Sequence, residues 1–138
     1  MPYKYAAELN LIENCPPADA ISCERESYRF VHENIADERN FKCICKLNSA
    51  RKLKAHEQCS GFGLSMFVSK EKAIERYKQL AFLNKNIGKT LGARLAQGTI
   101  KPNDGLVSKP NGMGHFDLWE VDGADFVTSF QIVADLMS

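Results

Sequence analysis

Side chains of two kinds alternate along residues 27–32. Tyr28 and Phe30 fall on one side of an extended chain, while Arg29 and Val31 fall on the other. A period of two residues is typical of a β-strand, because successive side chains of an extended chain point to opposite faces. The pattern therefore predicts a strand here, with an arginine on one face and aromatic rings on the other.

The pattern changes twice between residues 64 and 83. Residues 64–68 are almost continuously apolar, which predicts a short central strand. From residue 69 the apolar positions recur with the period of a helix as far as about Leu83. Ser69 precedes this helix, and its short side chain can accept a hydrogen bond from an unpaired backbone N–H of the first turn. We therefore predict a helix that is capped by Ser69.

Shorter segments complete the expected fold. A second helix is predicted to begin at Asn48 or Ser49 and to end near Cys59. Further strands are predicted at residues 41–47, 93–100, 115–121 and 128–133, with a helical first half of residues 93–100 as the alternative there. Because the strands are scattered around about two main helices, we predict a single α+β domain over residues 1–138 with a mixed or split β-sheet.

Composition adds an uneven distribution of charge to this picture. The chain has 138 residues and a formal net charge of +1. Residues 1–40 carry a net −4, residues 41–101 a net +10 and residues 102–138 a net −5. The basic middle predicts weak, nonspecific binding of polyanions or of another phosphate-containing ligand, or it pairs with the acidic ends within the fold. The lysines and arginine expected to contact a polyanion are Lys42, Lys46, Arg51, Lys52 and Lys54.

Five cysteines form no regular framework, and the sequence begins without the apolar segment of a signal peptide. We therefore expect reduced thiols, a cytoplasmic location and no membrane span. Cys43, Cys45, His56 and Cys59 are soft ligands within one stretch, which leaves a minor alternative of a zinc site. Their spacing is not the usual one for zinc, so we expect buried core cysteines and no metal.

The strand predicted at residues 115–121 carries ionisable side chains on both faces. His115 and Asp117 share one face and could form an acid–base pair, or they could simply face water. Glu120 lies on the opposite, apolar face, where a desolvated carboxylate could be catalytic, or it could only precede a turn. Ser65 is unusual within an apolar strand and could face a pocket.

In this order, the strand with Arg29, the strand with Ser65 that runs into a helix, and the late strand with Glu120 resemble small ADP-ribosyltransferase-like domains. That superfamily includes toxins, NAD-degrading toxins and RNA 2′-phosphotransferases. The resemblance implies a split β-sheet around a pocket for NAD. It also implies that Arg29 holds the dinucleotide, that Ser65 or Ser69 is the central serine, and that Glu120 stabilises the oxocarbenium ion.

The sequence departs from that superfamily in having neither a Ser-Thr-Ser triplet nor a Glu-x-Glu pair. The absence of the second glutamate favours NAD hydrolysis, or a noncatalytic role, over transfer to a protein acceptor. We therefore predict NAD-dependent chemistry at a glycosyl bond. The alternative is a noncatalytic regulatory or immunity module that binds a protein or a nucleic acid.

Overall fold

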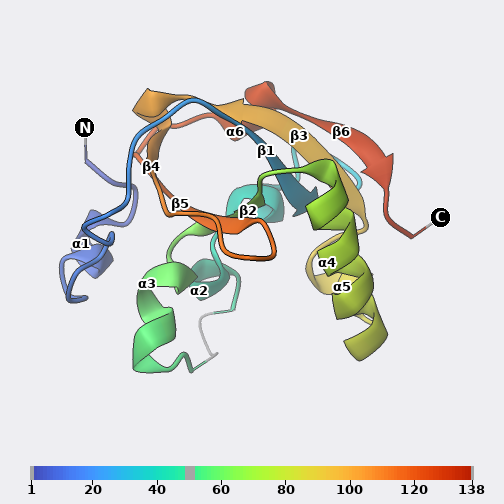
Figure 1. Cartoon of the computed structure of the whole chain (residues 1–138), viewed down its shortest axis with the longest axis horizontal. Helices are drawn as coiled ribbons and strands as arrows, with labels where there is room; N and C mark the ends of the chain where they lie inside the picture. Colours follow the sequence, from blue (N-terminus) through green and yellow to red (C-terminus); the bar gives the residue numbers. More distant parts are fainter. Residues whose placement is uncertain (1, 49–51, 138) are drawn as a thin grey trace.

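Six antiparallel strands form one sheet in a computed structural model that describes residues 2–48 and 52–137. Their order across the sheet is β4-β5-β2-β1-β3-β6. Figure 1 shows the sheet curving over the helical segments below it. The strands are β1 (Arg25–Val31), β2 (Leu64–Phe67), β3 (Arg94–Ile100), β4 (Gly105–Val107), β5 (His115–Glu120) and β6 (Phe130–Asp135).

The sheet is split in its middle. β1 pairs with β3 over seven residues, and β2 pairs with β5 over four, but β1 and β2 share only the pair Tyr28–Phe67. Beyond this pair, β1 and β2 form no further paired residues. The space between them must therefore be filled by side chains or left as a cavity, and this position contains the candidate site.

One helix is much longer than the others. α4 (Lys70–Leu83) has 14 residues, and Ser69 caps it by accepting a hydrogen bond from the backbone N–H of Lys72. The shorter segments are α1 (Ala6–Leu9), η1 (Glu38–Phe41), α2 (Ile44–Leu47), η2 (Ala55–Glu57), α3 (Gln58–Gly61), α5 (Ile87–Thr90), η3 (Pro102–Asp104) and α6 (Phe126–Ser129). Within the described ranges no helix combines the length and the apolar character needed to cross a membrane.

Apolar side chains cover both faces of the sheet, and a helix packs on each face. On one face, Ala73 of α4 joins Phe67 and Leu95. On the other face, Phe126 of α6 joins a larger cluster that includes Leu64 and other buried residues of β2, β3 and β5. Burial of both faces explains why β2 is apolar at almost every position.

The α+β class is confirmed, as are the strands expected near residues 27–32, 64–68, 93–100, 115–121 and 128–133 and the helix after Ser69. The strand expected at residues 41–47 is wrong, because η1 and α2 occupy this segment. The backbone carbonyls of Asn40 and Lys42 accept hydrogen bonds from Arg29, so they do not join a strand ladder.

The second predicted helix is also wrong as a continuous element. Residues 49–51 lie outside the described residues, and the part that the structure describes contains the two short segments η2 and α3. Cys59, in α3, is bonded to Cys15 near the start of the chain. A tertiary tie of this kind fixes a short turn where local helical propensity alone would not, because helices this short are marginal in water.

Candidate functional site

Three polar side chains meet on the face of the sheet that α4 covers, where β2 lies beside β5. Ser65 of β2 is directly opposite Asp117 of β5. The Ser65 hydroxyl is 2.8 Å from Nε2 of His115, and the same nitrogen is 3.8 Å from Oδ1 of Asp117. Residues 115 and 117 therefore share a face, as the alternation predicted, and the structure brings Ser65 to them.

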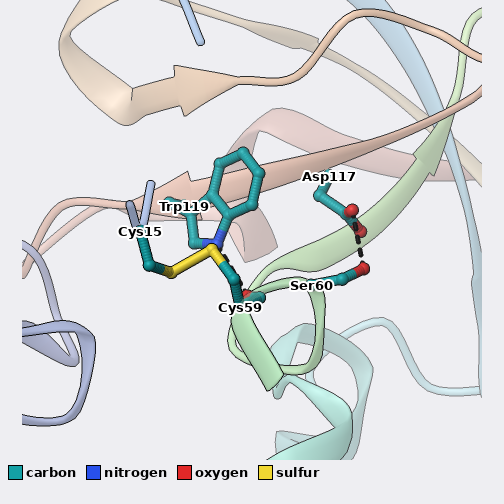
Figure 2. Close-up of a disulfide and its surroundings, with 5 residues drawn as sticks. All are labelled: Cys15, Cys59, Ser60, Asp117 and Trp119. Carbon is teal, nitrogen blue, oxygen red and sulfur yellow. Dashed lines mark hydrogen bonds between the residues drawn. A yellow bond between two sulfur atoms is a disulfide. The ribbon is translucent and has the colours of Figure 1, made fainter. Parts of the chain in front are cut away.

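A fourth side chain fixes the carboxylate of Asp117. Ser60 of α3 donates a hydrogen bond of 2.8 Å from its hydroxyl to Oδ2 of Asp117 (Figure 2). The other carboxylate oxygen, Oδ1, is the one nearest to His115. The two oxygens of Asp117 thus have different neighbours, and the carboxylate has a defined orientation.

Burial sets the protonation of this group of side chains. It lowers the pKa of His115, although the nearby Asp117 carboxylate opposes the shift. Burial also raises the pKa of Asp117, against the hydrogen bond from Ser60. His115 is therefore a neutral imidazole at neutral pH, able to accept a proton. Because Ser65 and Asp117 both approach Nε2, the arrangement is not that of a nucleophilic triad, in which the two partners contact opposite ring nitrogens.

A cavity of about 260 Å³ lies at the split between β1 and β2. Aromatic rings of Phe30 and Phe67 and the imidazole of His115 form part of its wall, and Arg39 and Arg76 supply positive charge. None of the described residues that line it carries a carboxylate. The remaining lining residues are Arg29, His32, Asn40, Leu47, Ser65, Leu80, Thr90, Leu91 and Met113.

Arg29 fills the split from the side of β1. Its Nε donates to the carbonyl of Asn40, and its two terminal nitrogens donate to the carbonyls of Ser65 and Lys42. Burial lowers the pKa of the guanidinium to about 10, which still leaves it charged at neutral pH. Three of its five N–H groups bond backbone carbonyls of two segments, the end of η1 and β2, so Arg29 joins the two halves of the sheet and keeps two donors for other partners.

Glu120 lies on the opposite face of β5, as the alternation predicted, and it is not among the residues that line the cavity. Its side chain is 3% exposed, its Oε1 atom has no hydrogen-bond partner, and Nζ of Lys4 is 4.0 Å from that oxygen. Burial raises the pKa of this carboxyl to about 7. The structure thus brings together Ser65, His115 and Asp117, and Arg29 bonds the carbonyl of Ser65. Glu120 lies apart from Ser65, His115 and Asp117, although the charge of Arg29 acts on it from between the two faces. Like Glu120, Asp117 does not line the cavity.

The other predicted serine has a local partner. Ser69 accepts the hydrogen bond from Lys72 at the start of α4 and does not line the cavity. Of the side chains that sequence reasoning missed, Ser60 is the one that contacts Asp117, 57 residues away along the chain. No short-range pattern indicates such a contact. Arg76 of α4 is half-buried, whereas the lysines of this helix are exposed. It lies three residues after Ala73 and four before Leu80, so an arginine within the apolar repeat was the signal that could have indicated it.

The expectation of reduced thiols is wrong for two of the five cysteines. Cys15 and Cys59 form a disulfide, with Cα atoms 5.6 Å apart (Figure 2). Cys59 is therefore not available as a thiolate ligand in this structure. Among the residues that the structure describes, no three His, Cys, Asp or Glu side chains are grouped so that they could hold a metal ion. Cys43 is buried, in agreement with the expectation of a core cysteine.

Ion pairs connect the basic middle of the chain to its acidic ends. Lys46 pairs with Glu8 at 2.6 Å, and Lys101 pairs with Glu24 at 3.0 Å. Of the residues expected to contact a polyanion, Arg51 lies outside the described residues. Pairing within the fold thus accounts for part of the charge segregation, and polyanion binding stays a prediction.

Comparison of this chain with protein-family models, with curated proteins and with solved structures finds no match.

Proposed function

We propose that the protein binds a nucleotide of the NAD class in the cavity at the split of the sheet and hydrolyses its N-glycosyl bond. The observation that carries the proposal is the convergence of Ser65, His115 and Asp117, of which Ser65 and His115 line a cavity with aromatic and cationic walls and Asp117 contacts His115 from behind. The resemblance of the sequence to ADP-ribosyltransferase-like domains supports the same chemistry, with one change of residue: Asp117 takes the role expected of Glu120.

The cavity wall suits a planar ring that is linked to phosphate. Phe30 and Phe67 offer ring surfaces against which a nicotinamide or adenine can pack. Arg76 offers a planar guanidinium group, which matches phosphate oxygens and stays charged, while Arg39 already donates two side-chain hydrogen bonds to Asp37 and would have to exchange or share that partner. None of the described lining residues carries a carboxylate, but Asp37 pairs with Arg39 at 2.7 Å, so Arg76 and the two remaining N–H groups of Arg29 are the donors that an anionic ligand would meet unpaired with a carboxylate.

Asp117 is the group that we expect to act in the bond cleavage. As the bond between ribose C1′ and the nicotinamide nitrogen breaks, its electron pair goes to nicotinamide and positive charge develops on the ribose. An ionised carboxylate held beside C1′ stabilises that charge. Water then bonds to C1′, and the neutral imidazole of His115 can accept its proton before releasing it to solvent. The products are ADP-ribose, nicotinamide and one proton.

The test measures nicotinamide release and NAD binding for the wild type, Asp117→Asn and Glu120→Gln. We expect Asp117→Asn to lower turnover about a hundredfold or more, by analogy with loss of one preorganised group, while NAD binding changes much less. We expect the smaller loss for Glu120→Gln, because that side chain lies on the other face of β5. A larger loss for Glu120→Gln would move the catalytic role to Glu120. A wild type that neither binds NAD nor releases nicotinamide would refute the proposal.

If these measurements refute NAD hydrolysis, they favour the noncatalytic alternative, a module that binds a protein or a nucleic acid. One observation points that way: Arg29 already donates three hydrogen bonds to the backbone, which is also what a purely structural arginine does. A structural arginine and a ligand-binding arginine differ in whether the two remaining N–H groups of Arg29 donate hydrogen bonds to an added ligand.

The disulfide bears on where the protein works. Disulfides persist in oxidising compartments and are rare in the reducing cytosol. The bond between Cys15 and Cys59 therefore favours an oxidising compartment over the cytoplasmic location that the sequence predicts. Quantifying thiols in protein from oxidising and from reducing expression hosts would separate the two.

A further inference from the structure

We propose that Ser60 is a positioning residue for Asp117, and that the Cys15–Cys59 disulfide together with Trp119 holds Ser60 in place. The inference rests on the proposed function for its catalytic meaning, but the contacts that carry it are independent of NAD. It assigns a role to α3 and to the N-terminal segment, neither of which lines the cavity beside His115.

α3 is too short to be stable on its own. It has four residues, and a single helical turn gains too few hydrogen bonds to offset the ordering of its backbone. Two ties fix it from outside, and both act on Cys59, the residue before Ser60 (Figure 2). The Cys59 sulfur is bonded to Cys15, and the Cys59 carbonyl accepts a hydrogen bond of 2.9 Å from Nε1 of Trp119.

The neighbours of α3 leave it little space to move in the folded state. A Cβ atom at Gly61 would lie 2.4 Å from Cδ1 of Leu53 and 2.7 Å from the sulfur of Cys45. A Cβ atom at Gly63 would lie 3.0 Å from Cβ of Asp117. The turn that carries Ser60 is therefore packed on one side and passes directly beside Asp117 on the other.

The hydrogen bond from Ser60 has two consequences for Asp117. It engages Oδ2, so that Oδ1 is the oxygen that faces His115. It also stabilises the ionised form and so opposes the effect of burial on the pKa of Asp117. The charged and polar groups that act on this pair are Ser60 of α3 and His115 of β5, with Arg76 of α4 and Arg29 of β1 acting on His115.

The molecule contains its own reporter for the position of α3. Trp119 is the only tryptophan of the chain, and its indole N–H is bonded to α3 itself. Displacement of α3 changes the environment of that indole, and therefore its fluorescence. The signal requires no ligand and no catalytic activity.

The first experiment compares Ser60→Ala with Ser60→Thr, which keeps the hydroxyl, and with Ser129→Ala in α6 as the matched control. The pKa of Asp117 is measured by NMR titration of its carboxyl carbon. We expect Ser60→Ala to raise that pKa by about one unit, because a hydrogen bond to a charged group is lost. The rising limb of the pH profile of nicotinamide release should move to higher pH by the same amount. Ser60→Thr should restore both values, and Ser129→Ala should change neither.

The second experiment loosens α3 without touching Ser60. Cys15→Ser should change the emission of Trp119 and raise the pKa of Asp117 in the same direction as Ser60→Ala, by a smaller amount. Trp119→Phe removes the other tie and should also raise the pKa, so it serves if Cys15→Ser fails to fold.

An unchanged pKa of Asp117 in Ser60→Ala would overturn the positioning role. An unchanged pKa of Asp117 in both Cys15→Ser and Trp119→Phe would overturn the role of the disulfide and Trp119. Expected pKa and fluorescence changes in a protein without NAD turnover would refute the proposed function and leave the positioning role intact.

Discussion

The two faces of β5 carry carboxylates that share a strand but have different surroundings. Asp117 accepts a hydrogen bond from Ser60 and lies near His115, which lines the cavity, although Asp117 itself is not among the lining residues. Glu120, three residues later, is buried with one oxygen that has no hydrogen-bond partner. Burial raises the pKa of both. A raised pKa therefore does not by itself identify a functional carboxylate, and what distinguishes Asp117 is its contact with Ser60 and with His115, which lines the cavity.

Arg29 stands between these two groups and interacts with both. Its charge lowers the pKa of Glu120 on one face and that of His115 on the other. Its hydrogen bonds to the carbonyls of Asn40, Ser65 and Lys42 join segments that the sheet itself leaves apart. The two faces are thus coupled through one buried guanidinium, and removing it should disturb both.

The largest effect on stability is expected from Arg29→Met. The substitution leaves three backbone carbonyls without their donor and Glu120 without its nearest buried cation. We expect the free energy of unfolding to fall by about 3–5 kcal/mol, the usual range for removing one partner of a buried charged group. Urea denaturation measures it.

Arg39→Met is the matched control for that experiment. Arg39 also lines the cavity, but its side chain is 51% exposed and pairs with Asp37 near the surface. Its loss should cost far less stability than the loss of Arg29, because solvent screens an exposed pair, and it should weaken NAD binding. Equal losses of stability for the two variants would contradict the structural role of Arg29.

Glu120→Gln tests the raised pKa of Glu120, on the second face of β5, through the pH dependence of stability. The pKa of Glu120 is about 7 in the folded protein, against an ordinary value of 4.5. Between these two pH values the folded state holds a proton that the unfolded state has lost, so the free energy of unfolding falls as the pH rises. At about 1.4 kcal/mol per unit, the fall that Glu120 contributes is roughly 3 kcal/mol.

Glutamine mimics the protonated carboxyl, so this part of the slope should disappear in Glu120→Gln. The variant should be more stable than the wild type at pH 8 and similar to it at pH 4. Thermal denaturation at a series of pH values gives the comparison, and the difference between the two curves removes the contribution of other titrating groups. Parallel curves would show that Glu120 has an ordinary pKa.

The sequence was sufficient to predict which side chains of β5 share a face, because successive side chains of a strand point to opposite faces. It was misleading at residues 41–47, which have the apolar content of a strand: Phe41 and Cys43 are indeed buried, but the neighbouring carbonyls bond Arg29. The contact of Ser60 with Asp117 could not be predicted, since it depends on a fold that closes 57 residues of chain. The local sequence pattern thus predicts on which face of a strand a side chain lies, and tertiary contacts determine which residues that side chain contacts.

Lys4→Met should give the smallest effect and refine the account of Glu120. Nζ of Lys4 is 4.0 Å from Oε1 of Glu120, while the backbone N–H of Lys4 donates to the Glu120 carbonyl and is unaffected by the substitution. The lysine side chain is 40% exposed, so solvent screens its attraction. We expect the pKa of Glu120 to rise by less than one unit and the stability at pH 8 to fall by less than about 1 kcal/mol. NMR titration of the Glu120 carboxyl provides the measurement, and Lys101→Met, which removes an exposed pair with Glu24, is the control. A rise of several units would mean that solvent does not screen the attraction of Lys4, whose charge lowers the pKa of Glu120 more than that of Arg29 does.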